Sequence, residues 1–222
     1  MGAQRLIFLG PPGSGKGTQA ARMSETFGLT ALSSGDTLRR EIADDSAVGR
    51  AAHAYVSTGQ LVPDDVITDV MLAAIDRLPR SAGFILDGFP RTIPQAEALQ
   101  QGLAARGIPL HGVVDFEIPD QEVVGRLAGR RVCTGCGMSY NVRSLPPRAA
   151  GVCDRCGAAL AQREDDREDV VATRLATYRR QTAPLIDFYR RHGLLHPVDA
   201  AADVNDVESA VAAEIEAMGV AG

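Results

Sequence analysis

The stretch Gly10-Pro11-Pro12-Gly13-Ser14-Gly15-Lys16-Gly17-Thr18 decides the fold of this chain. It follows the apolar run Leu6-Ile7-Phe8-Leu9 and precedes a helical pattern that begins near Gly15. Strand, glycine-rich loop and helix in this order are typical of a phosphate-binding P-loop. Glycines let consecutive backbone N–H groups turn toward an anion, and the helix adds the positive end of its dipole. A plain strand-to-helix turn is the alternative, but Gly-x4-Gly-Lys after a strand favours nucleotide binding.

Two positions of the loop concern the binding of nucleotide phosphates and of magnesium. Lys16 is predicted to reach the β- and γ-phosphates of a nucleotide. The next residue is Gly17, and a hydroxyl follows only at Thr18. The sequence therefore does not predict the direct hydroxyl–magnesium contact that is usual in P-loops.

Composition limits the class of protein. A chain of 222 residues with 45% hydrophobic residues can bury one main core with small insertions. The net charge of −5 gives no global basic field for nucleic acid, so we expect small-molecule partners. No apolar run approaches the roughly 20 residues of a membrane span, and no signal-peptide pattern opens the chain. These features predict a cytoplasmic protein.

Short apolar segments alternate with helical patterns along the chain. The expected strands are continuously apolar, as in strands covered on both faces. They are Arg5–Leu9, Thr30–Leu32, Phe84–Leu86, Val113–Phe116 and Leu195–Val198. The expected helices are Lys16–Phe27, Thr37–Ile42, Gly49–Ser57, Asp64–Arg77, Pro94–Arg106, Gln121–Arg130, Arg167–Arg191 and Val204–Met218. This alternation predicts an α/β fold with a parallel five-stranded sheet, helices on both faces, and a site at the carboxyl ends of the strands.

Two stretches interrupt the alternation and are predicted to be insertions over the carboxyl edge of the sheet. Residues 33–62 are rich in helical patterns and lack a strand, and residues 129–166 hold all four cysteines. The predicted division is a core P-loop domain of residues 1–32, 63–128 and 167–222, with an insert of residues 33–62 and a lid of residues 129–166.

The cysteines form two Cys-x-x-Cys pairs, Cys133/Cys136 and Cys153/Cys156, separated by 16 residues. This is the spacing of a four-cysteine zinc site, whose four thiolates leave no open position, so the metal would be structural. Disulfides would suit a secreted protein, and a redox pair would need its own strand–helix context. Iron in the same cage stays open as an alternative to zinc. A nucleic-acid-binding ribbon would need a basic or aromatic-rich face, and Tyr140 is the only aromatic residue of the lid.

Further motifs resemble those of adenylate kinases. They are Gly17-Thr18, Ser34-Gly35-Asp36, Asp87-Gly88-Phe89-Pro90-Arg91-Thr92 with Gln95, Gly129-Arg130-Arg131, and Arg163-Glu164-Asp165-Asp166. The resemblance extends from about Arg5 to the C-terminal helix and includes the long zinc-bearing lid of many bacterial members. It implies a P-loop NTPase-like fold and reversible transfer of the γ-phosphoryl group of ATP to AMP, giving two ADP, with Mg²⁺ and a structural Zn²⁺. It also implies ATP, AMP and ADP as partners, no nucleic acid or membrane, a monomer, and an AMP-binding role for residues 33–62.

The resemblance assigns roles to single residues. The catalytic set is Lys16, Asp87, Arg91, Arg130, Arg163 and Arg174. The ATP-binding set is Gly13, Ser14, Gly15, Lys16, Gly17, Thr18, Arg126, Arg130, Ser139 and Tyr140. The AMP-binding set is Ser34, Arg39, Gln60, Leu61, Val62, Gly88, Arg91, Gln95, Arg163 and Arg174. Arginine suits these tasks because its planar fork pairs with phosphate oxygens and stays charged when desolvated.

Several of these roles have a local basis in the sequence. Arg126 lies four residues before Arg130, which predicts that both project from one helix face. Asp87 ends an expected strand, where a carboxylate can hold hydrated magnesium, although Asp also initiates turns. By resemblance, the Gln95 amide reads the adenine edge of AMP. Asp36 is instead predicted to cap the helix that begins at the next residue, with no chemical role.

Two functional alternatives stay open. One is a kinase of other nucleotide specificity, such as a GTP:AMP or a UMP/CMP enzyme, although the long lid argues against typical UMP/CMP kinases. The other is a non-catalytic P-loop or zinc-ribbon binding module, against which the arginine set and the Asp87 motif argue. An enzyme would need the lid to close, because water otherwise competes for the phosphoryl group.

Overall fold

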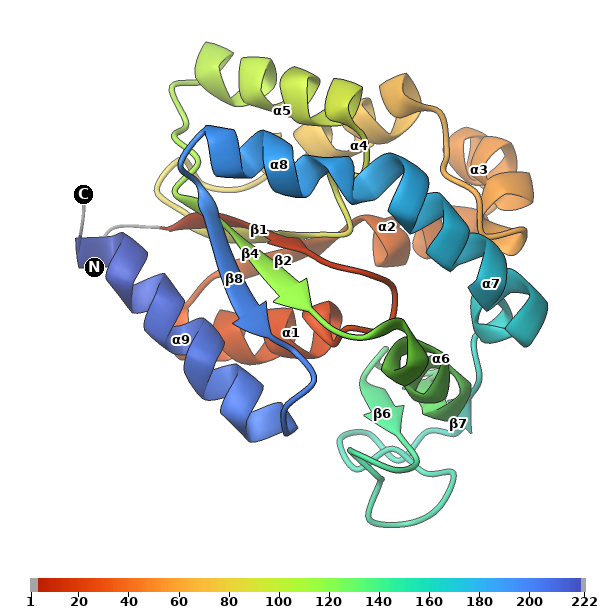
Figure 1. Ribbon diagram of the computed structural model, residues 1–222. Helices are drawn as coiled ribbons and strands as arrows, with labels where there is room; N and C mark the ends of the chain where they lie inside the picture. The colour runs from red at the N-terminus through yellow and green to blue at the C-terminus, as the bar shows by residue number, and fades with distance from the viewer. Residues whose placement is uncertain (1–3, 221–222) are drawn as a thin grey trace.

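The chain folds around a five-stranded parallel sheet, seen in a computed structural model that describes residues 4–220 (Figure 1). The strand order is β2-β3-β1-β4-β8, and every neighbouring pair is parallel. The strands are β1 (Arg5–Leu9), β2 (Thr30–Ser33), β3 (Phe84–Asp87), β4 (Gly112–Glu117) and β8 (Leu195–Asp199). The predicted fold class and strands are confirmed. Residues 1–3 and 221–222 of the predicted core lie outside the described residues.

Helices cover both faces of this sheet (Figure 1). On one face lie α1 (Lys16–Phe27) and α9 (Val204–Val220), and on the other lie α4 (Asp64–Asp76), α5 (Ile93–Ala105) and α8 (Pro184–Arg191). Strand β1 contributes side chains to the cores on both faces of the sheet, because successive side chains of a strand point to opposite faces. Leu6 and Phe8 pack into the α1/α9 layer, whereas Ile7 and Leu9 pack into the other. This double covering explains why the strands are apolar throughout.

The long helix expected over Arg167–Arg191 is divided into segments. It consists of α7 (Glu168–Thr177), a π-helical turn over Tyr178–Thr182, and α8. Pro184 begins α8 and has no backbone N–H to give to the preceding turn. The wider turn absorbs this loss, since the Ala183 N–H donates to the Tyr178 carbonyl at 2.9 Å. Among the described residues, no helix is both long and apolar enough to cross a membrane.

The predicted insert contains two packed helices, α2 (Ser34–Ala43) and α3 (Ala47–Ser57). The expectation that Asp36 caps α2 is wrong. Ser33 is the N-cap, with extended backbone (φ −93°, ψ 117°) and its hydroxyl accepting from the Asp36 N–H at 3.3 Å. Serine and aspartate are both good caps, so this run offered several starting points. Asp36 lies in the first turn, and its carboxylate is free for other partners.

A glycine at the start of α3 permits the close approach of α2. A Cβ on Gly49 would lie 2.0 Å from the backbone oxygen of Glu41. We expect Gly49→Ala to lower the free energy of unfolding by about 1–3 kcal/mol, because backbone must shift to relieve the overlap. Gly125→Ala in α6 (Asp120–Gly129) is the control, since a Cβ there meets nothing within 4 Å. It should instead add about 0.5–1 kcal/mol through helix propensity. Urea denaturation measures the free energy of unfolding of both variants. A change of the same sign in both would contradict the packing argument.

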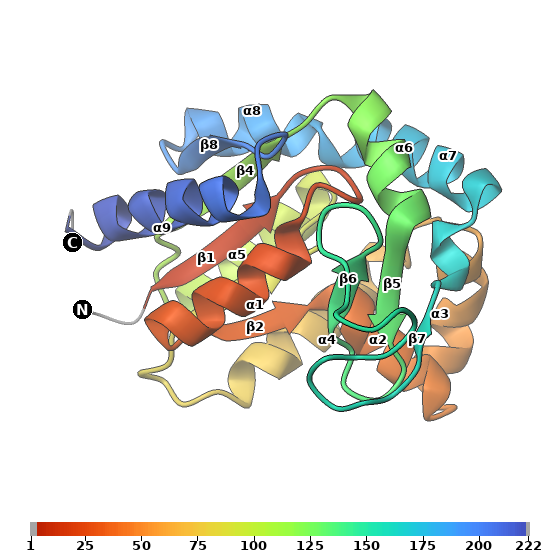
Figure 2. The same ribbon diagram turned by 90° about the horizontal axis from the view of Figure 1, so that it is seen from below.

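The predicted lid contains a small antiparallel sheet in the order β6-β5-β7, seen from below in Figure 2. Its strands are β5 (Arg130–Cys133), β6 (Ser139–Asn141) and β7 (Leu160–Ala161), and a short 3-10 turn, η1 (Glu164–Asp166), leads back to α7. The prediction that Arg126 and Arg130 share a helix face is wrong. Helix α6 ends at Gly129, and Arg130 takes extended backbone (φ −69°, ψ 137°) because it begins β5.

Candidate active site

A cavity of about 1110 Å³ lies at the carboxyl ends of the central strands, between the core, α2 and the lid. Every residue that the sequence predicts at the nucleotide sites lines this cavity. They are Gly13, Ser14, Gly15, Lys16, Gly17, Thr18, Ser34, Arg39, Gln60, Leu61, Val62, Asp87, Gly88, Arg91, Gln95, Arg126, Arg130, Ser139, Tyr140, Arg163 and Arg174. The fold therefore brings all of them to one hollow, although their individual contacts with nucleotides stay predictions.

The P-loop presents the open end of α1 to the cavity. Gly15 is the N-cap of α1 and has a left-handed backbone (φ 98°), which glycine adopts at little cost. No side chain caps this helix, whereas Ser33, Ser46 and Thr92 cap α2, α3 and α5. The first-turn N–H groups of α1 therefore keep their donor capacity for an anion.

Lys16 begins α1, and its ammonium reaches back to the loop. Its ammonium donates to the carbonyls of Gly10 and Pro11, both at 2.8 Å, and to the Ser14 hydroxyl at 3.2 Å. Burial lowers the pKa of Lys16 to about 8, although the nearby Asp87 carboxylate opposes the shift. The ammonium is thus desolvated and held by neutral acceptors, ready to exchange them for phosphate oxygens.

Asp87 reaches the loop through the strand register. Phe8 of β1 pairs with Asp87 of β3, so the carboxylate lies beside the start of α1. A Cβ on Gly17 would lie 3.3 Å from Asp87 Oδ2. A larger residue after the lysine would therefore crowd the carboxylate, and glycine leaves space next to it.

Asp166 holds two of the arginines. Its side chain is fully buried and forms a bidentate ion pair with Arg130, with 2.6 Å from Arg130 Nε to Oδ2. Arg174 donates to the other oxygen of Asp166 at 3.1 Å and to the Asp165 carbonyl at 2.7 Å. A buried carboxylate is stable when both of its oxygens are paired in this way.

Asp36 and Asp165 join the insert to the lid through two further arginines. Arg39 of α2 pairs with Asp36 at 2.6 Å and with Asp165 at 3.6 Å. Arg163 from the lid contacts Asp36 at 3.4 Å. Each arginine of this group thus faces a carboxylate in the free protein, in a cavity suited to phosphates.

Burial and, after it, the clustering of these charges shift their pKa values. Burial lowers the pKa of Arg163 to about 10, and the positive charges of Arg39 and Arg130 add to the shift. Burial also lowers the pKa of Arg174 to about 10, with the Asp165 carboxylate opposing it. Burial would raise the pKa of Asp165, but the surrounding arginines, Arg174 first, hold it below its usual value. The pocket thus destabilises its own positive charges in a way that a bound phosphate would relieve.

A second network lies on the α2 side of the cavity. The Ser34 hydroxyl donates to the Gly88 carbonyl at 2.7 Å, and Arg91 Nε donates to the same carbonyl at 2.6 Å. Gln95, which is 2% exposed, accepts the Arg91 backbone N–H at 2.7 Å and donates to Asp64 at 2.7 Å. Gly88 thus orients both the serine hydroxyl and the Arg91 guanidinium.

The polar groups of two predicted ATP-site residues form hydrogen bonds within the protein. Arg126 donates to the carbonyls of Ala200 and Ala201, at 2.8 and 3.2 Å, so it lies against the loop after β8. The Tyr140 hydroxyl accepts the Asp154 N–H at 2.8 Å and lies 3.5 Å from Cys153 Sγ. Both residues line the cavity, but the Tyr140 hydroxyl belongs to the interior of the lid.

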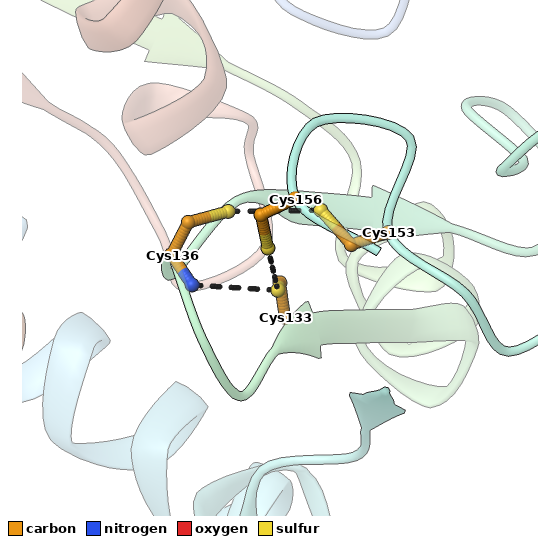
Figure 3. A group of neighbouring side chains, drawn as sticks. All are labelled: Cys133, Cys136, Cys153 and Cys156. Atoms are coloured by element: carbon orange, nitrogen blue, oxygen red, sulfur yellow. Dashed lines mark hydrogen bonds between the residues drawn. The ribbon is translucent and has the colours of Figure 1, made fainter. Parts of the chain in front are cut away.

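The four cysteines converge in the lid (Figure 3). Their sulfur atoms all lie within 4.8 Å of one another, with 3.3 Å between Cys133 and Cys156 and 3.6 Å between Cys136 and Cys153. All four are free thiols rather than disulfides. Tetrahedral zinc with Zn–S bonds near 2.3 Å separates its sulfurs by about 3.8 Å. The donor set and its spacing therefore fit a zinc ion.

The lid also favours the thiolate form of its buried cysteines. The Cys136 N–H points at Cys133 Sγ and is the main cause that lowers the pKa of Cys133. The Tyr140 hydroxyl is the main cause that lowers the pKa of Cys153 to about 6. The pKa of Cys156 is instead raised to about 12: the Ala158 N–H opposes this shift, and hydrogen bonds with the Cys133 and Cys136 side chains cause it. Metals bind the thiolate, so the contacts of Cys133 and Cys153 favour a metal site, and Cys156 would lose its proton on binding.

Sequence reasoning gave no role to several carboxylates of this site. Asp165 and Asp166 stood in a recognised motif, and Asp64 opens α4 two residues after Val62. Their partners are arginines and an amide from distant parts of the chain. Acidic residues that directly follow a predicted site arginine, as in Arg163-Glu164-Asp165-Asp166, were the only available signal.

Comparison with known proteins gives one consistent result. The Adenylate kinase family model matches residues 8–194. The chain is 45% identical over 207 residues to the adenylate kinase of Carboxydothermus hydrogenoformans, covering 93% of this chain and 97% of that protein. It is 45% identical over 212 residues to that of Citrifermentans bemidjiense (96% and 99% covered) and 43% identical over 211 residues to that of Archaeoglobus fulgidus (95% and 97% covered).

Proposed function

This chain belongs to the adenylate kinase family, and from that premise we infer how its cavity residues carry out the reaction. The reaction is reversible phosphoryl transfer from ATP to AMP, giving two ADP. It needs alignment and charge neutralisation more than covalent participation by the protein. The observation that supports this assignment best is the gathering of the P-loop lysine and the six predicted arginines on one cavity.

We assign the ATP phosphates to the P-loop side of the cavity. The backbone N–H groups of the P-loop and of the first turn of α1, together with the Lys16 ammonium, would surround the β- and γ-phosphates. Arg130 would approach from the lid, with Arg126, Ser139 and Tyr140 beside it. Because Arg130 already pairs with buried Asp166, its fork is held in orientation before any substrate arrives.

AMP would bind on the α2 side. Arg39 and Arg91 would grip its phosphate, and Arg163 and Arg174 would bridge the reacting groups once the lid closes. Ser34, Gln60, Leu61, Val62 and Gly88 would line the acceptor pocket, with Gln95 reading the base. The Gln95 amide can do so because each of its polar atoms uses only one of two hydrogen-bonding positions in the free protein.

Two metals fit the residues present. Mg²⁺ would bind beside Asp87, in the space that Gly17 leaves next to the carboxylate, and it would neutralise phosphate charge. Zn²⁺ would bind Cys133, Cys136, Cys153 and Cys156 and would stabilise the lid without touching substrate. Sulfur donors without an oxygen ligand favour zinc or iron over magnesium at this second site.

The remaining proposals concern the chain as a whole. The arginine ion pairs that join α2 to η1 support treating residues 33–62 and 129–166 as an AMP-binding insert and a lid on one core. Four free cysteines suit a reducing compartment, which supports a cytoplasmic location. We propose a monomer whose partners are ATP, AMP and ADP, since all the residues that the resemblance assigns to the two nucleotides line a single cavity of this chain.

Acceptor choice tests this function. We expect AMP to exceed CMP, UMP and GMP in kcat/KM by at least about a hundredfold, because a site built for adenine leaves its own polar groups unpaired with another base. A coupled assay with each acceptor, and with ATP or GTP as donor, measures this. Comparable values for UMP or CMP would replace the adenylate assignment by another nucleoside monophosphate kinase. No turnover with any pair would favour a binding module.

A further inference from the structure

Asp64 contacts the amide that we propose as the reader of the acceptor base. Its Oδ1 accepts from Gln95 Nε2 at 2.7 Å, and its Oδ2 accepts from the Thr92 hydroxyl at 2.9 Å. On the other side of the amide, Gln95 Oε1 accepts the backbone N–H of Arg91 at 2.7 Å. A carboxylate can only accept and a backbone N–H can only donate. The two partners therefore allow one orientation of the Gln95 amide and oppose its rotation by 180°.

Neighbouring elements hold Asp64 in this position. It begins α4, where the positive end of the helix dipole favours a carboxylate. The Thr92 hydroxyl that donates to Asp64 also caps α5, because it accepts the Gln95 N–H at 3.3 Å. The carboxylate, the cap and the amide thus form one network between α4 and α5, and Gln95 lines the cavity.

The fixed orientation matters because purines differ in what they present at positions 1 and 6. A 6-aminopurine offers a donor at N6 and an acceptor at N1. These match the remaining lone pair of Gln95 Oε1 and the remaining N–H of Nε2. A 6-oxopurine reverses both groups, so it would require the rotated amide. Rotation would place Oε1 against the Asp64 carboxylate and Nε2 against the Arg91 N–H, leaving buried polar groups opposed.

We propose that Asp64 is a specificity-determining residue that acts through Gln95. By fixing the amide, it sets the preference of the acceptor site for 6-aminopurine over 6-oxopurine nucleotides. This inference rests on the proposed function, in which Gln95 reads the base of AMP. Asp64 itself touches no substrate and is a positioning residue.

The test compares AMP with inosine monophosphate, which differs at the purine 6-position and has no 2-amino group, in the variant Asp64→Asn. Asparagine can still accept from Thr92, and its amide can donate to a rotated Gln95 Oε1. The variant therefore removes one of the two contacts that oppose rotation, while the Arg91 N–H remains. We expect the ratio of kcat/KM for AMP to that for inosine monophosphate to fall at least about tenfold, mainly through a lower KM for inosine monophosphate, while the KM for ATP is unchanged. Both acceptors are measured on one sample, so the ratio does not depend on the folded fraction.

Matched variants separate the possible outcomes. Asp65→Asn is the control, because it removes the same charge from an exposed neighbour on α4 and should leave the ratio as in the parent protein. Gln95→Leu should also lower the ratio if Gln95 reads the base. A shift in Gln95→Leu without one in Asp64→Asn would overturn the role of Asp64 alone. No shift in either variant would overturn the proposed reading by Gln95, and equal losses with both acceptors would reduce Asp64 to a structural residue.

Discussion

Replacing Lys16 by methionine should lower turnover at least about a thousandfold while the fold stays intact. This is the scale of removing one key charge from a transferring phosphoryl group. Methionine matches the length of the apolar stem but offers no donor to the loop carbonyls or to phosphate. The control is Arg77→Met, which removes the same unit of charge from an exposed position at the end of α4. Near-normal turnover in a folded Lys16→Met protein would place the phosphates elsewhere.

The same residue gives a pH test. The lowered pKa of about 8 belongs to the free protein, so kcat/KM for ATP should fall as the pH rises through that value and the ammonium loses its proton. Lys16 is also the only lysine of the chain. An amine-directed reagent should therefore modify a single side chain, and ATP should protect it. Modification that is insensitive to ATP would contradict a phosphate contact.

Loss of the lid metal should have the second large effect, this time on stability. We expect one zinc per chain, and structural zinc in small peptides contributes on the order of 10 kcal/mol of apparent binding energy. Here that energy is shared with a larger protein, but the lid has few apolar contacts of its own. Its small core consists of Cys133, Tyr140 and Cys153, with Ala158 and Leu160 against it. The metal must therefore replace much of the missing packing.

Cys153→Ser, or removal of zinc by a chelator, should thus lower the melting temperature and loosen the lid before it affects the core. Val152→Ser is the matched control, because this neighbouring side chain is exposed and is not a proposed ligand. Metal analysis, melting curves and turnover at low temperature together decide the result. Partial turnover should persist. Immediate and complete loss of activity in a folded protein with an intact lid would indicate that the zinc is catalytic and not structural.

Much of the fold follows from the sequence because buried parallel strands are continuously apolar. Each central strand was predicted to within one residue at either end. The lid sheet was not predicted, since its strands have only two to four residues and fold around sulfur atoms instead of a broad apolar face. Arg130 was placed on a helix for the same reason: nothing in the local pattern shows that β5 begins there.

The gathering of the site residues was predictable where motifs mark them, as at Lys16, Asp87 and the cysteines. It was not predictable where a residue matters only through a tertiary partner. Asp36 stands next to two serines, and all three residues are good helix caps. Capping was therefore a sufficient local explanation for Asp36, and its ion pairs with Arg39 and Arg163 were not predicted. Asp64 gave no local signal, because the amide that it contacts lies on another helix.

The carboxylates that face the arginines in the free protein have a consequence for the reaction cycle. Asp36 and Asp165 pair with guanidinium groups that we assign to the substrates, so under this proposal they would compete with phosphate. Substrate entry would then exchange one anion for another at Arg39, Arg163 and Arg174, so these three guanidinium groups would keep an anionic partner. The same carboxylates can recapture the arginines after transfer, which favours departure of ADP. A pocket of arginines alone would hold its product more tightly and turn over more slowly.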